Sequence, residues 1–152
     1  MENKLSAKLY EQILDNMPVA CIDIVVCKNR KILLIKRNNQ PEKGNWWIVG
    51  GRILKNEKLA DAVKRKVKEE VGLYIENARF LYPDEYFSEK SIFGGIGTHS
   101  TVFIYLVDAK GEIKLDSTSS EYQWVDKEWF RKNKSELQNY VVRAIENSDV
   151  FK

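Results

Sequence analysis

The stretch GRILKNEKLADAVKRKVKEEVGL, from Gly51 to Leu73, says most about the fold, because it predicts a helix with an acidic residue on its apolar side. Asn56 is a type of residue that caps helix N-termini and Gly72 is the type that ends helices. At about 100° per residue, the apolar side chains gather on one third of the helix circumference. They are Leu59, Ala60, Val63, Val67 and Val71. Glu70 falls inside this arc, with Lys66 and Glu69 beside it.

The position of Glu70 needs a chemical explanation. An ionised carboxylate on an apolar face is costly unless another group pairs with it. Glu69 adds a second negative charge near the helix C-terminus, where the helix dipole disfavours it. A hard divalent cation with oxygen ligands, Mg²⁺ or Mn²⁺, would meet this need. The glycine pair Gly50–Gly51, just upstream, lets the backbone approach a metal ion or a phosphate closely.

The remaining sequence predicts one α/β domain over residues 1–152. Helical spacing covers 3–16, 127–134 and 136–147, and strand patterns cover 19–26, 31–36, 46–49, 78–87, 98–107 and 122–125. We expect Pro83 to interrupt the strand over 78–87. Strands before and after a central helix, mostly linked as hairpins, predict a mixed sheet with helices packed on it.

Composition excludes several classes of protein. The chain is 43% hydrophobic and 31% charged, as ordinary globular proteins are. Its net charge of +3 is too small to indicate a nucleic-acid partner and is compatible with an anionic small molecule. No apolar run is long enough to span a membrane, and the N-terminus is not a signal peptide. Cys21 and Cys27 are too far apart on one strand to bond each other, which favours reduced thiols in a cytoplasmic protein.

The fixed residues of the opening stretch resemble the Nudix box, G-x5-E-x7-R-E-U-x-E-E-x-G-U, in which U is a bulky aliphatic residue. Every fixed position matches except one, where Lys66 replaces a glutamate. The matching residues are Gly51, Glu57, Arg65, Val67, Glu69, Glu70, Gly72 and Leu73. The resemblance implies a Nudix-type α/β/α sandwich (α+β) with a mixed central sheet. It also implies that Glu57 and Arg65 brace the loop onto the helix.

The same resemblance implies a metal site. Glu69, Glu70 and the carbonyl of Gly50 are expected to bind Mg²⁺ against a substrate diphosphate. Lys66 cannot bind a metal ion or activate water as the family glutamate does. It would lower the negative charge of the site and weaken a second or third metal ion, or it would contact a phosphate itself.

A narrower resemblance covers residues 22–59, which are similar to the GDP-mannose mannosyl hydrolases. They share KR-x-N, x-x-P-x-x-G-x-W and GGR followed by K-x-E, and these enzymes also lack the box glutamate. They release GDP and the free sugar by water attack at the sugar carbon, whereas other Nudix enzymes attack phosphorus. By this resemblance Asp23, Arg37 and Arg52 belong to the substrate site, and the arginines assist the departing diphosphate. It also implies a homodimer.

The general base is not identified by the sequence. The mannosyl hydrolases have a Gln-His pair where this chain has Thr118 and Ser119, and neither residue serves as a base at neutral pH without help. Glu121 resembles the late-loop glutamate that other Nudix enzymes use as base or metal ligand, and it could equally be a surface residue. His99, the single histidine, is the other candidate base, although a lone histidine at a strand start is more often structural.

The sequence therefore predicts a Mg²⁺-dependent Nudix hydrolase of a nucleoside diphosphate derivative, with a nucleotide sugar such as GDP-mannose as the best candidate. Attack at carbon and attack at phosphorus both stay open. The alternatives are a general nucleoside di- or triphosphate pyrophosphohydrolase and a catalytically weak nucleotide-binding sensor. Lys66 and the missing Gln-His pair motivate the sensor, whereas the retained carboxylates argue against it.

Overall fold

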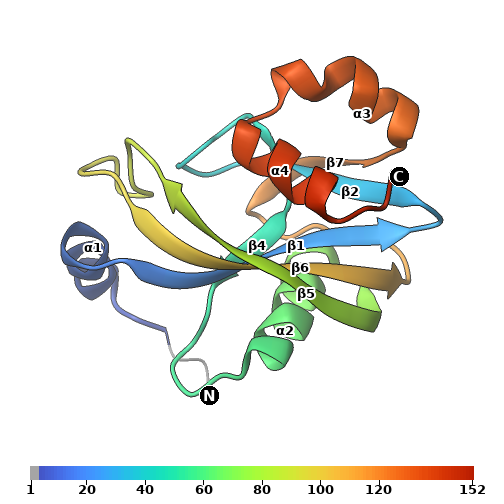
Figure 1. Cartoon of the computed structure of the whole chain (residues 1–152). Coiled ribbons are helices and arrows are strands. Elements are labelled where there is room, and N and C mark those ends of the chain that lie inside the picture. The colour runs from blue at the N-terminus through green and yellow to red at the C-terminus, as the bar shows by residue number, and fades with distance from the viewer. Residues whose placement is uncertain (1–3) are drawn as a thin grey trace.

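The computed structural model describes residues 4–152 and is organised around one mixed sheet (Figure 1). Its strands are β1 (Val19–Lys28), β2 (Lys31–Arg37), β3 (Trp46–Trp47), β4 (Val49–Arg52), β5 (Tyr74–Phe87), β6 (His99–Lys110) and β7 (Ser119–Val125). The helices are α1 (Ala7–Asn16), α2 (Leu59–Val71), α3 (Lys127–Asn133) and α4 (Asn139–Asn147), with a 3₁₀ turn over Lys134–Glu136. The predicted first helix and the predicted domain both begin among residues 1–3, which lie outside the described part.

The strand order places the glycine pair beside the middle of the sheet. The strands run in the order β3-β2-β1-β6-β5, with β4 paired to β1 and β7 paired to β2. β1 is parallel to β6, and the other pairs are antiparallel. Along one edge, β1 pairs with β4 through its first half and with β2 at its end. This register sets Gly50 opposite Asp23 and Gly51 opposite Ile22.

Two apolar clusters fill the two sides of the sheet and confirm the predicted α/β/α sandwich. One cluster joins the sheet to α3 and α4 through Phe130, Val141 and Ile145. The other joins it to α2 through Val63 and Val67. Figure 1 shows α2 on one side of the sheet and α3 and α4 on the other. A side chain on β1 therefore faces either α2 or α4, depending on its place in the strand.

The central helix α2 begins later than its sequence predicts. Its N-cap is Lys58, and Asn56 instead lies in a left-handed turn with φ of 66°. The carboxylate of Glu57 accepts a hydrogen bond from the Leu54 N–H, so the turn extends beyond Asn56. The predicted end is confirmed, because Gly72 is left-handed with φ of 72°. Ala60 is exposed, contrary to the prediction for the apolar face.

Several predicted boundaries differ from the structure, among them the start of β5 at Tyr74 and the start of β7 at Ser119. Pro83 does not interrupt β5, because β5 is the edge strand of the sheet. On an edge strand, a residue without an N–H can face the side that has no partner strand. The predicted strand over 46–49 is divided at Ile48 into β3 and β4. The predicted last helix over 136–147 starts only at Asn139, after a 3₁₀ turn.

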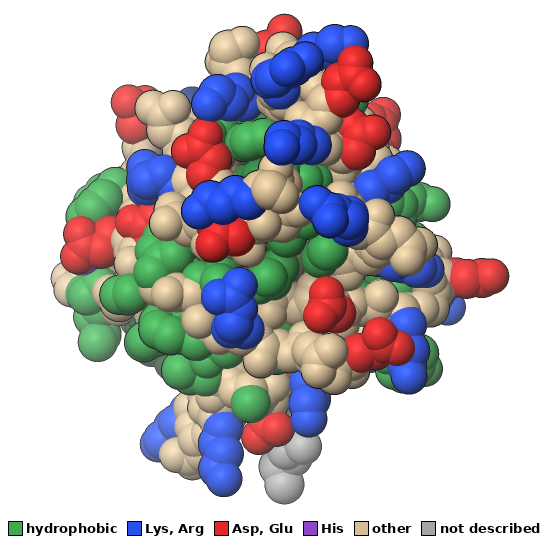
Figure 2. Space-filling model, turned by 45° about the vertical axis from the view of Figure 1, so that its right-hand side comes forward, with side chains coloured by type: hydrophobic (Ala, Val, Ile, Leu, Met, Phe, Trp, Pro, Cys, Tyr) green, Lys and Arg blue, Asp and Glu red, His purple; other side chains and the backbone are tan. Residues whose placement is uncertain are grey.

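The distribution of surface charge and the state of the two cysteines agree with what the sequence predicts. Lys and Arg side chains alternate with Asp and Glu over the face seen in Figure 2, without a continuous basic area. Cys21 and Cys27 are free thiols, as their spacing predicts. Within residues 4–152, none of the helices has the length and apolar character needed to cross a bilayer.

Candidate active site

A cleft of about 180 Å³ opens between α1, the first half of β1 and the loop that follows β2. It brings together Asp23, Arg37 and Arg52, which the resemblance assigns to the substrate site, and Gly50 also lines it. These residues come from β1, β2 and β4, so pairing of the strands positions all of them. A site built on paired strands holds its side chains more rigidly than one built on loops.

The two arginines are held in the cleft by different contacts. The Nε of Arg37 donates to the carbonyl of Pro41 at 2.6 Å, and this contact fixes the guanidinium plane. The guanidinium of Arg52 lies over the ring of Tyr10, 5.3 Å from its centroid. Tyr10 belongs to α1, so the N-terminal helix forms part of the cleft. Two oriented guanidinium groups can donate to several oxygens of one diphosphate.

Asp23 lies in the cleft as a partly buried acid. Its Oδ2 accepts a hydrogen bond from the Tyr140 hydroxyl at 2.5 Å, which links β1 to α4. Burial raises the pKa of the Asp23 carboxyl to about 7, although the Tyr140 hydrogen bond and the charge of Arg37 lower it. Asp23 therefore exchanges a proton near neutral pH, as a group that takes up or releases protons in a reaction needs to do.

Replacing Asp23 with asparagine should stabilise the protein at pH 8 while removing activity. The folded-state pKa near 7 lies above the usual value of 3.8, so the unfolded chain loses this proton first as the pH rises. Wild-type stability is therefore lost between about pH 4 and pH 7 and stays lower above that range. We expect Asp23→Asn to be about 2 kcal/mol more stable at pH 8, since the cleft leaves part of the carboxyl hydrated. Urea unfolding at several pH values measures this, and an equal difference at pH 4 would contradict the assigned cause.

A lysine side chain lies against the two glutamates at the C-terminal end of α2. Glu70 is only 6% exposed, on the apolar side of α2 as the helical wheel predicts. The Nζ of Lys66 lies 2.7 Å from the Oε1 of Glu70 and 3.7 Å from the Oε2 of Glu69. Burial raises the pKa of the Glu70 carboxyl, and the charge of Lys66 opposes this rise. The ammonium thus supplies the counter-charge for which the sequence suggests a metal ion.

The glycine pair lies next to both the cleft and the acidic end of α2. A Cβ atom on Gly50 would collide with the Asp23 carboxylate, and a Cβ on Gly51 would lie 2.9 Å from the Cε of Lys66. Asp23 therefore fills the space beside Gly50 and Lys66 fills the space beside Gly51, while both glycines line the cleft. The charges of Glu70 and Lys66 act on the Asp23 carboxyl across this pair.

Glu57 and Arg65 join the loop to α2, as the resemblance implies. Arg65 donates from Nε and Nη2 to the two Glu57 oxygens at 2.6 Å and 2.9 Å, in a bidentate pair. Its Nη2 also donates to the carbonyl of Arg52 at 3.0 Å, and its Nη1 donates to Glu69 at 3.1 Å. This pair lowers the pKa of Glu57 and fixes the strand end that carries Arg52.

The structure brings neither candidate base into the cleft. Glu121 is exposed on β7, where its carboxylate lies 3.6 Å from the Nζ of Lys36. His99 stacks on Phe87 with ring centroids 4.3 Å apart, and its buried Nε2 has no hydrogen-bond partner. Both side chains lie outside the lining of the cleft. Among the acids proposed from the sequence, Asp23 is the one that lines it.

Sequence reasoning missed Asp116, whose negative charge acts on Glu70 and raises the pKa of its carboxyl. The loop that carries Asp116 is fixed to the C-terminal end of α2. The Asp116 N–H donates to the Glu70 carbonyl at 3.1 Å, and the Asp116 carboxylate accepts from the Thr118 N–H at 3.0 Å. No spacing in the sequence indicates this approach, because the two residues are distant along the chain.

The carboxylates at the end of α2 suit a single divalent cation, although they do not form a larger acidic cluster within residues 4–152. Within residues 4–152, no three Asp, Glu, His or Cys side chains lie close enough together to hold a metal ion. Glu69 and Glu70 offer two carboxylates of the kind that such an ion would need. Mg²⁺ is often held by one or two carboxylates and completes its shell with water and substrate phosphate. The donor set therefore suits one such ion, with Lys66 as a competitor for Glu70.

A mixed sheet between two helical layers, with a carboxylate helix behind a glycine pair, is the architecture of a Nudix-type hydrolase. The NUDIX domain family matches residues 17–145. The low-salt glycan biosynthesis protein Agl8 of Haloferax volcanii is 34% identical over 112 residues, which are 74% of this chain and 69% of that protein. The ADP-ribose pyrophosphatase of Methanocaldococcus jannaschii is 32% identical over 110 residues, or 72% of this chain and 62% of that enzyme.

Solved structures agree on the fold. A MutT NUDIX hydrolase from Burkholderia pseudomallei superposes with a TM-score of 0.71 at 24% identity, covering 87% of this chain and 98% of that one. The chain belongs to the Nudix hydrolase family.

Proposed function

We propose that this protein hydrolyses a nucleoside diphosphate derivative in the cleft, and that its substrate is a nucleotide sugar such as GDP-mannose. The observation that carries the proposal is the convergence of Asp23, Arg37 and Arg52 in one cleft. The guanidinium groups of Arg37 and Arg52 suit a diphosphate that leaves with increasing negative charge. The 34% identical relative is named for glycan biosynthesis, which adds support for a substrate that carries a sugar.

Each cleft residue has a role in this reaction. Arg37 and Arg52 donate to the diphosphate oxygens and stabilise the charge that collects on them as the bond breaks. Asp23 orients the attacking water or accepts its proton, in the position in which Tyr140 holds its carboxylate. Glu121 is the acid predicted for the base role, and it would have to leave Lys36 to reach the cleft. The arrangement therefore favours Asp23 for this step.

Glu69 and Glu70, with the carbonyl of Gly50, would hold Mg²⁺ or Mn²⁺ against the diphosphate. When bound, the ion withdraws charge from the phosphate oxygens and orients them. Lys66 stands where the family has a glutamate able to activate water for attack at phosphorus. We therefore favour attack at the sugar carbon, with release of the free sugar and the nucleoside diphosphate.

Two other functions are compatible with the family. A pyrophosphohydrolase that attacks phosphorus is favoured by the 32% identical relative, which is named an ADP-ribose pyrophosphatase. A catalytically weak nucleotide sensor is favoured by Lys66, whose ammonium lies 2.7 Å from Glu70. A sensor has no evident need for the Glu57–Arg65 brace and two metal-binding carboxylates.

A substrate panel separates the enzyme from the sensor. We expect Mg²⁺-dependent turnover of GDP-mannose or another nucleotide sugar, and slower turnover of ADP-ribose and 8-oxo-dGTP. Product analysis by ion-exchange chromatography identifies the released nucleotide. Binding of nucleotides without turnover of any compound in the panel would favour the sensor and would refute the proposed hydrolase.

A further inference from the structure

Lys66 is the one Nudix-box residue whose family role its own chemistry rules out, yet it is held firmly. Its side chain is 15% exposed, on a helix whose other lysines, Lys64 and Lys68, are exposed. Its Nζ contacts Glu70 at 2.7 Å and approaches Glu69 at 3.7 Å. A lysine that served only for solubility would extend into water, because burying its charge is unfavourable without a partner.

The contact with Glu70 gives Lys66 a role in the absence of a divalent cation. Glu70 is 6% exposed, and the nearby Asp116 adds negative charge. A positive group at 2.7 Å therefore offsets the charge of the buried Glu70 carboxylate. A divalent cation bound by the same carboxylates would meet the ammonium directly and would have to displace it.

The end of the Lys66 side chain lies beside the glycine pair. Its Cε and Nζ lie against Gly51, at 2.9 Å and 3.2 Å from the position that a Cβ would take. Gly51 also lines the cleft, next to Arg52. The absence of a side chain on Gly51 leaves the ammonium a short route past the backbone toward bound phosphate.

We propose that Lys66 is a transferable counter-ion, which neutralises Glu70 before a divalent cation binds and contacts the substrate diphosphate afterwards. The inference rests on the proposed function, because it takes Glu69 and Glu70 as the cation site and a nucleoside diphosphate as the ligand. It gives Lys66 opposite effects on the two ligands, since the ammonium competes with the cation and attracts the phosphate. Replacing a residue with only a structural role would not strengthen cation binding while weakening diphosphate binding.

The test uses Lys66→Gln, which removes the charge and keeps an N–H donor for Glu70, so that the helix stays folded. We expect the Kd for Mn²⁺ alone to fall about tenfold relative to wild type, because a competing unit charge is gone. We expect the Kd for GDP at saturating Mn²⁺ to rise about tenfold, because one cation fewer meets the diphosphate. Electron paramagnetic resonance of free Mn²⁺ gives the first value, and calorimetric titration gives the second.

Two controls separate charge from position. Lys64→Gln removes an exposed lysine from the same helix and should leave both Kd values unchanged. Lys66→Arg keeps the positive charge, so its Kd values for Mn²⁺ and for GDP should both stay close to those of wild type. An unchanged Kd for Mn²⁺ in Lys66→Gln would overturn the counter-ion, and an unchanged Kd for GDP would overturn the transfer to phosphate. Failure of wild type to bind GDP would refute the proposed substrate class, while the Mn²⁺ measurement would still decide the counter-ion.

Discussion

Glu70→Gln should reduce kcat for the proposed nucleotide-sugar substrate by at least about 100-fold while leaving the protein folded. The substitution keeps the shape of the side chain but removes the charge that a divalent cation needs. Glu70 lies 2.7 Å from Lys66 and is almost completely buried, so no water-exposed carboxylate can replace it there. Steady-state kinetics over a range of Mg²⁺ concentrations measures the loss, and circular dichroism checks the fold.

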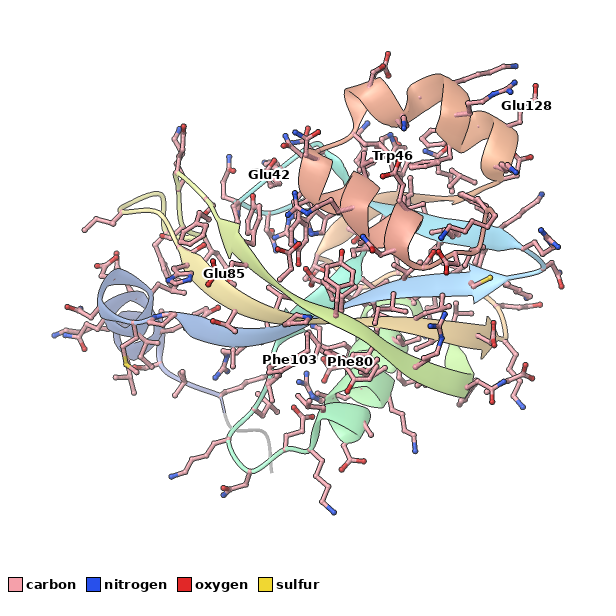
Figure 3. The ribbon with its side chains drawn as sticks, viewed as in Figure 1. Glu42, Trp46, Phe80, Glu85, Phe103 and Glu128 are labelled. Atoms are coloured by element: carbon pink, nitrogen blue, oxygen red, sulfur yellow. The ribbon has the colours of Figure 1, made fainter. Side chains whose placement is uncertain are left out.

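Glu128→Gln is the matched control. Glu128 forms the same kind of i,i+4 pair, at 2.9 Å from Lys132 on α3, but both side chains are about two-thirds exposed. Figure 3 shows Glu128 on the outer helix, away from the sheet. We expect its kinetics to match wild type, because exposed pairs contribute little. A fully active Glu70→Gln enzyme would remove Glu70 from the cation site.

Arg37→Lys should also lower kcat by about 100-fold, although it keeps the positive charge. Arg37 uses its Nε on the Pro41 carbonyl at 2.6 Å, which leaves the two terminal nitrogens for the diphosphate. A lysine ammonium cannot hold the loop and donate a fixed pair of hydrogen bonds at the same time. The loss should appear in kcat more than in KM, because the charge on the leaving diphosphate grows toward the transition state.

Arg79→Lys provides the comparison for Arg37, since Arg79 is exposed on β5. It should leave kcat and KM unchanged. An Arg37→Lys enzyme that raises KM with unaltered kcat would show that Arg37 binds substrate and transition state equally. That result would contradict its assistance to the leaving group.

The features that follow from local periodicity were predictable. The period of α2 places Glu70 on the buried side, and the left-handed Gly72 ends the helix where its residue type indicates. The start of α2 was not predictable, because the Glu57 carboxylate takes the Leu54 N–H and draws Asn56 into a left-handed turn. That competition depends on a side-chain contact across the loop, and cap preferences do not include it.

The resemblance to the mannosyl hydrolases names three residues that strand pairing brings into one cleft. Asp23, Arg37 and Arg52 converge because β1, β2 and β4 are neighbours, whereas Glu121 lies on β7 with its carboxylate toward Lys36. A bulge between Lys36 and Arg37 changes the register with β7, and no pattern in the sequence marks it.

Other contacts of the site depend on the three-dimensional arrangement alone. Asp116 approaches Glu70 through a loop that packs on the end of α2. Tyr86 donates to Glu42 in the loop between β2 and β3 (Figure 3), beside the aromatic rings of Trp47 and Tyr140. These contacts join residues far apart along the chain, which periodicity and short motifs do not relate.

The measurement that tests the central claim most directly is hydrolysis of GDP-mannose in ¹⁸O-water, with both products analysed by mass spectrometry. Water attack at the sugar carbon transfers the label to free mannose and leaves GDP unlabelled. This is the result that a leaving diphosphate held by Arg37 and Arg52 predicts. Label in a phosphate of the released nucleotide, with unlabelled sugar, would contradict it and would assign the protein to the Nudix enzymes that attack phosphorus.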